Sequence, residues 1–318
     1  MQRMQQQTEQ TTKTDPGRPQ GLVSPTSDVF TAAFFSAPKN ESSLRDFINA
    51  VMTDGRQPLI QEATVLNPFN VKTFAADRKL VLDVRVRDEM NRNYDIEVQT
   101  ESHPGFRDRM LLHWAEIYSS LLETGDDFTK LRPVRSIVLT VFPIFPALRN
   151  LHTVFEICSR ENPEVLLTDH FQIHFLRLGD MLKRKLEGLS ELYRGLQDWF
   201  KFFAFADTTP ENQMTQLVEN NQAVMTAYEE LRRFSSNEEM RDLERRRRRF
   251  IEDQRIYVDA ARDEGEAKGK AEGKAEGKAE GKAEGKSEIA QNMKHEGFDM
   301  VVIAKMTGLS RGEIECLD

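Results

Sequence analysis

Asp83 and Glu97 are the two residues whose type and spacing most directly suggest chemistry. They lie in the segments 79–87 and 93–99, in which apolar and polar side chains alternate. This period of two is typical of β-strands with one buried face. The polar residues 88–92 between the segments predict a turn, so the two strands should form an antiparallel hairpin.

The register of this hairpin follows from its two polar faces, which must coincide. A turn centred on Met90 places Asp83 opposite Glu97, and Arg85 opposite Asp95. Two directly opposed carboxylates repel each other, whereas Arg85 and Asp95 attract. A shared hard cation such as Mg²⁺ would make the acidic pair favourable. The alternative is a solvated strand face with a slightly different register and no ion.

The surrounding pattern predicts an α/β fold with a mixed central sheet flanked by helices. Apolar residues recur at helical spacing between residues 25 and 51, and a longer helix is expected from Phe106 to Glu123. The Ile- and Val-rich segment Val134–Phe142 is typical of a buried strand. Further strand candidates are 59–65 and 171–177.

Changes in composition divide the chain into five parts. The expected parts are a disordered Gln- and Thr-rich arm (1–23), an α/β core (24–150), a mostly helical extension (151–262), a repeat spacer (263–288) and a small helical tail (289–318). The spacer repeats Gly-Lys-Ala-Glu. A Gly in every fourth position and like charges four residues apart predict a solvated, weakly helical segment.

Composition also limits the classes of function. Lys and Arg number 44 against 52 Asp and Glu, a net charge of −8, which excludes nucleic-acid binding by bulk positive charge alone. The two cysteines, Cys158 and Cys316, are too far apart for a C-x-x-C pair. His103 and His113 lack zinc-ligand spacing, so no zinc site is expected. With no apolar span and no evident signal peptide, a cytoplasmic protein without membrane contact is predicted.

The tail has the pattern of a helix-turn-helix. A helix containing Lys305 is followed by Thr307–Ser310, and Ser310 with Glu313 forms the S-x-x-E capping box of a last helix. Lys305, Ser310 and Arg311 are the candidates for DNA contact in this tail. The alternative is a small helical hairpin used for self-association.

These motifs together resemble a known family. Asp83 followed by Glu97-Val98-Gln99 resembles the D…(D/E)-X-K core of PD-(D/E)XK nucleases, with Gln in the Lys position. The match is closer to the Rpn family of recombination-promoting nucleases and transposases. That resemblance adds Asp28-Val29-Phe30-Thr31, Arg107 and Arg109, and Gly125-Asp126, and it covers roughly residues 24–318.

The resemblance implies a restriction-endonuclease-like core and a DNA endonuclease that depends on Mg²⁺, or on Mn²⁺ in its place. Asp83 and Glu97 would hold the metal, and Gln99 would orient the attacking water. Gln99 cannot replace the charge of Lys. Secondary candidates are Asp28, Lys79 and Arg109, of which Lys79 would supply positive charge.

Two other functions compete with this one. The first is a non-catalytic DNA-binding or assembly protein that keeps the nuclease fold. The second is a helical scaffold assembled through residues 186–262, which would make the chain a homo-oligomer.

Overall fold

The structure is a computed structural model of the 318-residue chain, and it describes residues 21–53, 58–71, 73, 83–102, 104–179 and 189–317. The chain forms two compact units, one up to Arg248 and one from Arg249 onward. No helix within the described ranges is both long enough and apolar enough to span a membrane.

The first unit contains one mixed sheet of six strands in the order β1-β2-β3-β4-β6-β5. β3 and β4 pair in parallel, as do β4 and β6, while the remaining neighbours are antiparallel. The sheet therefore has a parallel centre and antiparallel edges. The strands are β1 (Thr64–Val65), β2 (Val84–Arg87), β3 (Asn93–Gln99), β4 (Val134–Thr140), β5 (His152–Phe155) and β6 (Phe171–Arg177).

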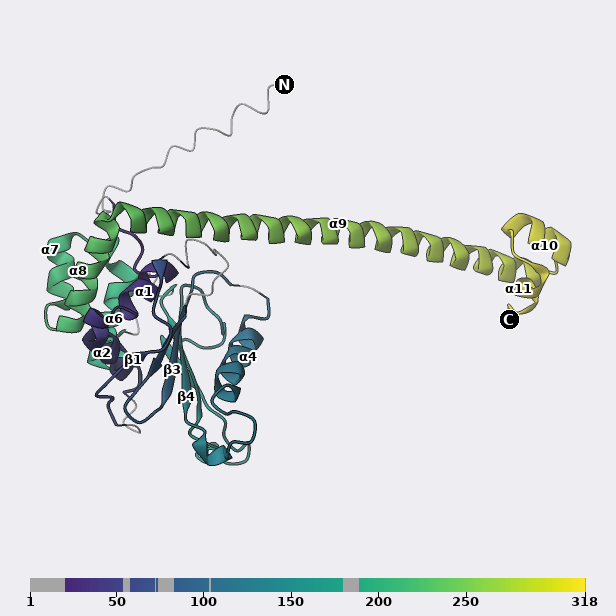
Figure 1. The fold of residues 1–318 in the computed structure, drawn as a ribbon. Coiled ribbons are helices and arrows are strands. Elements are labelled where there is room, and N and C mark those ends of the chain that lie inside the picture. The colour runs from purple at the N-terminus through teal and green to yellow at the C-terminus, as the bar shows by residue number, and fades with distance from the viewer. Residues whose placement is uncertain are drawn as a thin grey trace, which may run out of the picture. The chain divides into compact units, whose positions relative to one another are not determined.

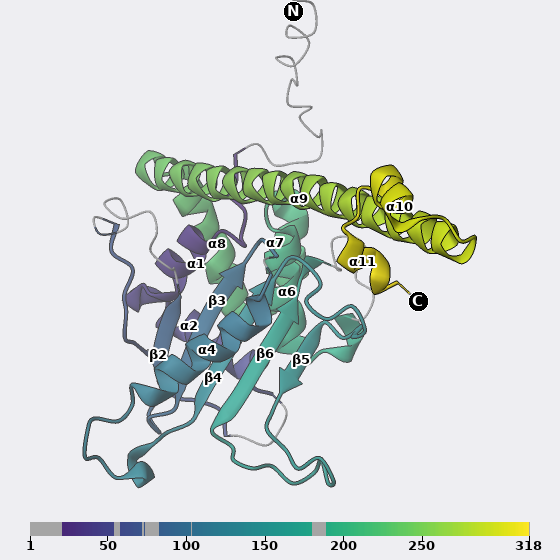
Figure 2. The same ribbon diagram turned by 90° about the vertical axis from the view of Figure 1, so that its right-hand side faces the viewer.

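Helix α4 (Phe106–Ser119) connects β3 to β4 and covers one face of the sheet. A parallel pair of strands requires such a crossover. Figures 1 and 2 show α4 lying across the strands on this face, with the helices formed by residues 28–51 and 194–236 on the opposite face. Phe106 and Met110 of α4 pack on Val138 of β4 and Ile173 of β6.

The opposite face carries the main hydrophobic core, built largely from aromatic rings. Trp199 contacts the rings of Phe35, Phe47 and Phe203, and its indole N–H donates to Asp46 at 2.8 Å. The α-helices of this layer are α1 (Asp28–Phe35), α2 (Glu41–Val51), α6 (Arg194–Phe205), α7 (Glu211–Val218) and α8 (Gln222–Ser236). Short 3₁₀ turns lie at Pro38–Asn40, Phe128–Lys130 and Leu189–Glu191.

The hairpin register predicted from the sequence is confirmed. Arg85 pairs with Asp95, and Val84 pairs with Ile96. The turn is closed by Asp88, whose carboxylate accepts hydrogen bonds from the backbone N–H of Met90 and of Arg92. Residues 79–82, the first half of the predicted first strand, lie outside the described residues.

Several other boundaries differ from the expectations. The strand predicted over 171–177 is present as β6, but β5 before it was not predicted, and the first α-helix described after these strands starts at Arg194. Helix α4 ends at Ser119 rather than near Glu123. The strand expected over 59–65 is reduced to the two residues of β1.

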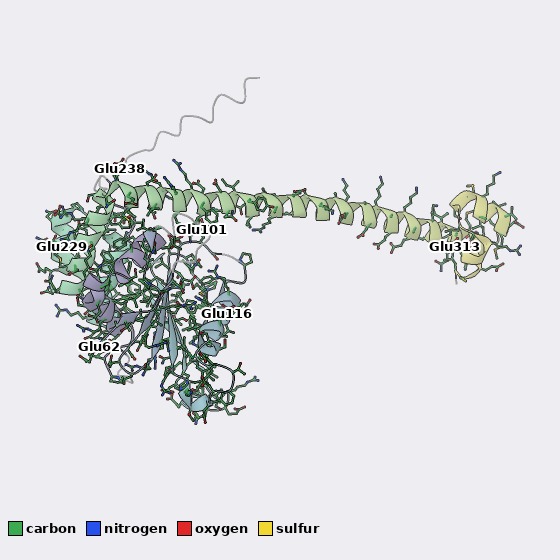
Figure 3. The ribbon with its side chains drawn as sticks, viewed as in Figure 1. Glu62, Glu101, Glu116, Glu229, Glu238 and Glu313 are labelled. Carbon is green, nitrogen blue, oxygen red and sulfur yellow. The ribbon has the colours of Figure 1, made fainter. Side chains whose placement is uncertain are left out.

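Helix α9 runs from Glu238 to His295 and includes the whole Gly-Lys-Ala-Glu repeat. The repeat is thus a continuous helix in the structure, rather than the weakly helical segment predicted. Its predicted exposure is confirmed, since residues 263–284 are all exposed. Figure 3 shows the side chains along this part of α9 extending into solvent.

The tail consists of the end of α9, α10 (Met300–Thr307) and α11 (Arg311–Glu315). Ala290, Ile303 and Ile314, one from each helix, form its buried core. Gly308 ends α10 with a φ of 72°, a left-handed conformation that favours glycine. The predicted capping box of Ser310 and Glu313 is present at the start of α11.

Because the repeat contributes no buried side chain, its deletion should not destabilise the first unit. Removal of residues 265–285 is expected to shift the thermal midpoint of that unit by less than about 2 °C. Circular dichroism and calorimetry of the full chain and of the deletion variant would measure this. A drop of many degrees would show that the repeat packs on another part of the chain.

Candidate functional site

The polar face of the β2–β3 hairpin lies under helix α4. Asp95 and Glu97 of β3 are only 2% and 3% exposed, and Asp83, directly before β2, has a side chain that is 10% exposed. The sequence pattern predicted one buried face for each strand, but both faces of β3 are buried, because β3 is an inner strand with α4 above it. The carboxylates are therefore removed from bulk water.

His113 of α4 lies among these three carboxylates. Its Nδ1 atom is 3.4 Å from Oδ2 of Asp95 and 3.8 Å from Oε2 of Glu97. Its Nε2 atom is 3.8 Å from Oδ2 of Asp83. One imidazole thus contacts acidic groups from both strands of the hairpin.

Two arginines also neutralise the cluster. Nε of Arg85 donates to Oδ2 of Asp83 at 3.0 Å, and Nη2 of Arg109 donates to Oε1 of Glu97 at 3.2 Å. Gln99 donates from Nε2 to the same Oε1 atom of Glu97 at 2.7 Å. Glu97 therefore accepts hydrogen bonds from two of the predicted site residues.

Burial sets the electrostatics of the site. Desolvation, together with the nearby Asp83 and Glu97, raises the pKa of Asp95 to about 7, although His113 opposes this shift. The interaction with Glu97 raises the pKa of His113 above its ordinary value, with Asp95 and Asp83 acting in the same direction. The cluster therefore holds more negative charge than its surroundings stabilise well.

Two buried polar atoms beside the cluster have no hydrogen-bond partner within the described part of the chain. They are Oδ1 of Asp95 and Oγ of Ser136, which lie on paired residues of β3 and β4. A buried carboxylate oxygen without a partner is unfavourable unless a cation or a proton neutralises it.

The donor set fits a divalent cation. Ligand atoms of Asp83, Asp95 and His113 all lie within 4.8 Å of one another. Two carboxylates and an imidazole suit Mn²⁺, and carboxylate oxygens alone suit Mg²⁺. Asp83 belongs both to this group and to the Asp83–Glu97 pair predicted from the sequence.

The secondary candidates have different environments. Asp28 accepts from Nε of Arg247 at 2.8 Å, and the neighbouring Ser27 donates to Glu244, so the carboxylate of Asp28 is engaged in an ion pair. Lys79 lies outside the described residues. Arg107, two residues before Arg109, packs over the ring of Phe145.

In the tail, Lys305 is exposed, and Ser310 caps α11 by accepting from the backbone N–H of Glu313. Arg311 donates to Oε1 of Glu315 at 3.1 Å. Of the three candidates for DNA contact, two are thus engaged within the tail.

Sequence reasoning missed Asp95 and His113 as members of the cluster. Asp95 shares the polar face of its strand with Glu97, so the alternation that identified Glu97 also contained it. His113 lies four residues after Arg109, and this spacing places both side chains on one face of a helix. A search along that face, rather than for zinc spacing, would have found it.

Comparison with known proteins finds matching families for two parts of the chain. Residues 25–261 match the PD-(D/E)XK nuclease family transposase, and residues 283–317 match the C-terminal HTH domain of the Rpn/YhgA-like nuclease family. Comparison with curated proteins and with solved structures gives no match. The first match covers well over half of the chain, so the chain belongs to the PD-(D/E)XK nuclease family, with an HTH domain of the Rpn/YhgA-like type at its C-terminal end.

Proposed function

We propose that this chain is a DNA endonuclease that hydrolyses phosphodiester bonds with the help of Mg²⁺ or Mn²⁺. The observation that supports this most strongly is the convergence of Asp83, Asp95 and Glu97 around His113, on the hairpin whose sequence resembles the nuclease motif. A divalent cation supplies Lewis-acid chemistry toward phosphate oxygens.

In this proposal Asp83 and Glu97 hold the cation, and Asp95 and His113 complete the cluster of side chains around it. Oδ1 of Asp95 supports this, since it has no hydrogen-bond partner among the described residues and a cation would neutralise it. Gln99 donates a 2.7 Å hydrogen bond to Glu97, and its own side-chain oxygen can accept a hydrogen bond from the attacking water and so orient it.

Arg109 has a second role in the proposal. Its side chain is half exposed and contacts Glu97 from the first turn of α4. A guanidinium there can form two parallel hydrogen bonds to a phosphate. Arg109 would therefore exchange Glu97 for the DNA backbone when a cation and DNA bind.

The non-catalytic function also has an observation in its favour. Asp83 and Glu97 already have arginine partners within the chain, so the cluster is partly neutralised without a metal. In that case the core would be a DNA-binding or assembly module, and cleavage would be absent.

Asp83→Asn is expected to remove cleavage and to spare DNA binding. The change removes a charged oxygen ligand and hardly alters the size of the side chain. Plasmid nicking in Mg²⁺ or Mn²⁺ should fall by at least about a hundredfold, because electrostatic stabilisation is usually the largest catalytic effect. A gel-shift assay would measure binding. Cleavage equal to that of the parent chain would place the chemistry elsewhere.

Changes at Gln99 test its place in the motif. Gln99→Lys should keep part of the activity, since the ammonium still donates to Glu97. It also adds the positive charge that Lys carries at this position in other PD-(D/E)XK nucleases. Gln99→Leu removes the donor and should abolish cleavage. The rate of supercoiled plasmid loss measures both. If Gln99→Leu cuts as fast as the parent, Gln99 has no part in the reaction.

Arg109→Gln should bind Mn²⁺ more tightly and cut DNA more slowly. The substitution removes a cation that competes for Glu97, and a half-exposed ion pair predicts about a two- to fivefold gain in affinity. Calorimetric Mn²⁺ titration of the chain without DNA measures this gain. The matched control is Arg107→Gln, which makes the same charge change on the same turn of α4. An equal gain in Mn²⁺ affinity for Arg107→Gln would show that the loss of any positive charge on this turn has the same effect, and that the Arg109–Glu97 pair is not its cause.

A further inference from the structure

Arg135 of β4 is a buried arginine that has no acidic partner within the described part of the chain. Its side chain lies on the main-core face of the sheet, because Ile137 and Leu139, two and four residues later in β4, belong to that core. Arg135 is 1% exposed. Its Nε atom donates to Oε1 of Gln172 at 2.8 Å, but Nη1 and Nη2 have no hydrogen-bond partner among the described residues.

His174 of β6 adds another buried nitrogen atom without a partner. β6 lies beside β4, as Figure 2 shows, and Gln172 pairs with Arg135 across the two strands. His174 follows two residues later on the same face of β6. Diagonal neighbours of this kind are about 7–8 Å apart, which is within reach of a long side chain. His174 is 2% exposed, and its Nε2 atom has no hydrogen-bond partner in the ranges that the structure describes.

The hydrogen bonding of His174 allows Nε2 to be a donor. Burial, and then the nearby His152 and Arg135, lower the pKa of His174 well below its ordinary value, so the ring is neutral. Its Nδ1 atom is 2.9 Å from Nε2 of His152. When Nδ1 accepts this hydrogen bond, the single N–H of the neutral ring is at Nε2. In that tautomer Nε2 is a donor without an acceptor, close to the guanidinium of Arg135.

The acidic residues of this region are engaged elsewhere or exposed. Asp88 accepts from Nε of Arg92 at 2.5 Å, and this ion pair is itself buried. Glu156 accepts from the side-chain amide of Gln172. Asp169 has a side chain that is 63% exposed. The charge of Arg135 therefore has no counter-charge in contact with it, and an uncompensated buried charge is strongly unfavourable.

We propose that Arg135 and His174 bind a small anion, and that this anion is chloride. Its charge would offset the guanidinium, and it would accept hydrogen bonds from Nη1 and Nη2 of Arg135 and from Nε2 of His174. All three nitrogen atoms are buried, and an enclosed position favours a monatomic ion over a phosphate or a carboxylate.

The proposed anion site is separate from the acidic cluster. Successive residues of a strand point to opposite faces of the sheet. Arg135 therefore lies on one face, and the next pair across β3 and β4, Asp95 with Ser136, lies on the other. The proposal thus goes beyond the nuclease function and does not depend on it.

The thermal midpoint of the first unit, measured by calorimetry of the full chain, tests the proposal. Sodium chloride should raise this midpoint by at least about 3 °C when it replaces sodium gluconate at a constant total salt of about 300 mM. The reason is that an anion which binds only the folded chain stabilises it. Gluconate keeps the ionic strength the same, and it is too large for an enclosed site.

Substitutions of Arg135 test whether this residue is the source of the chloride effect. Arg135→Met removes the charge and keeps an unbranched side chain, so it should abolish the difference between chloride and gluconate. In gluconate this variant should unfold at no lower temperature than the parent, since an apolar side chain in place of an unpaired buried charge is neutral or stabilising. Arg135→Lys keeps the charge with fewer donors in one plane, and should retain a smaller chloride effect.

The matched control is Arg132→Met, the same substitution at an exposed arginine three residues earlier. Arg132 donates to the backbone carbonyls of Thr129 and Leu131. This variant should keep the full chloride effect. Circular dichroism would establish that each variant is folded.

Bromide locates the anion directly. Crystals of the parent chain grown in sodium bromide should show anomalous scattering from one bromide ion beside Arg135 and His174. Bromide bound elsewhere and not at these residues would overturn the proposal. It would also fail if the parent unfolded at the same temperature in chloride and in gluconate, which would leave a water molecule as the occupant. A chloride effect that survives in Arg135→Met, or that Arg132→Met loses as well, would place anion binding at another part of the chain.

Discussion

The burial of β3 under helix α4 is the constraint on which the site depends. β3 pairs in parallel with β4, and a parallel pair requires a crossover, which here is α4 itself. The crossover helix must cover the sheet, so it lies on the acidic side of the hairpin. Asp95 and Glu97 are buried for this reason, and not because their own segment is apolar.

Burial of carboxylates has an immediate consequence for the residues around them. Charges without partners are unfavourable in the interior, so the elements that bury Asp95 and Glu97 also bring cations. Helix α4 contributes Arg109 and His113, and β2 contributes Arg85. The neutralisation is incomplete, since the pKa of Asp95 is raised to about 7 and one of its oxygens has no partner within the part of the chain that the structure describes.

Local patterns predicted the hairpin well, and its neighbours less well. The register between Arg85 and Asp95 follows from period-two alternation and from the Asp88 turn, both of which involve adjacent residues. The cover over the polar face comes from a helix that follows β3 in the chain but packs through its own apolar side. Alternation alone could not distinguish solvent from α4 as the neighbour of that face.

Two other differences between the sequence prediction and the structure concern β5 and the repeat. β5 is a short edge strand whose residues His152–Phe155 carry little alternation, and only its pairing with β6 makes it a strand. In the repeat, glycine cost and like charges four residues apart argue against a helix. The structure nevertheless continues α9 through it, with a Lys268–Glu272 contact of 3.9 Å at its start.

In the proposed function the arginines around the cluster would take part in two states. With Arg85 and Arg109 paired to Asp83 and Glu97, the acidic cluster is partly neutralised and the hairpin is stabilised. A divalent ion would compete with these pairs, and it concentrates more charge in one position than either guanidinium does. Arginines released by the ion would be available to a phosphate, which accepts their hydrogen bonds. On this proposal, cleavage would require the ion and the DNA together.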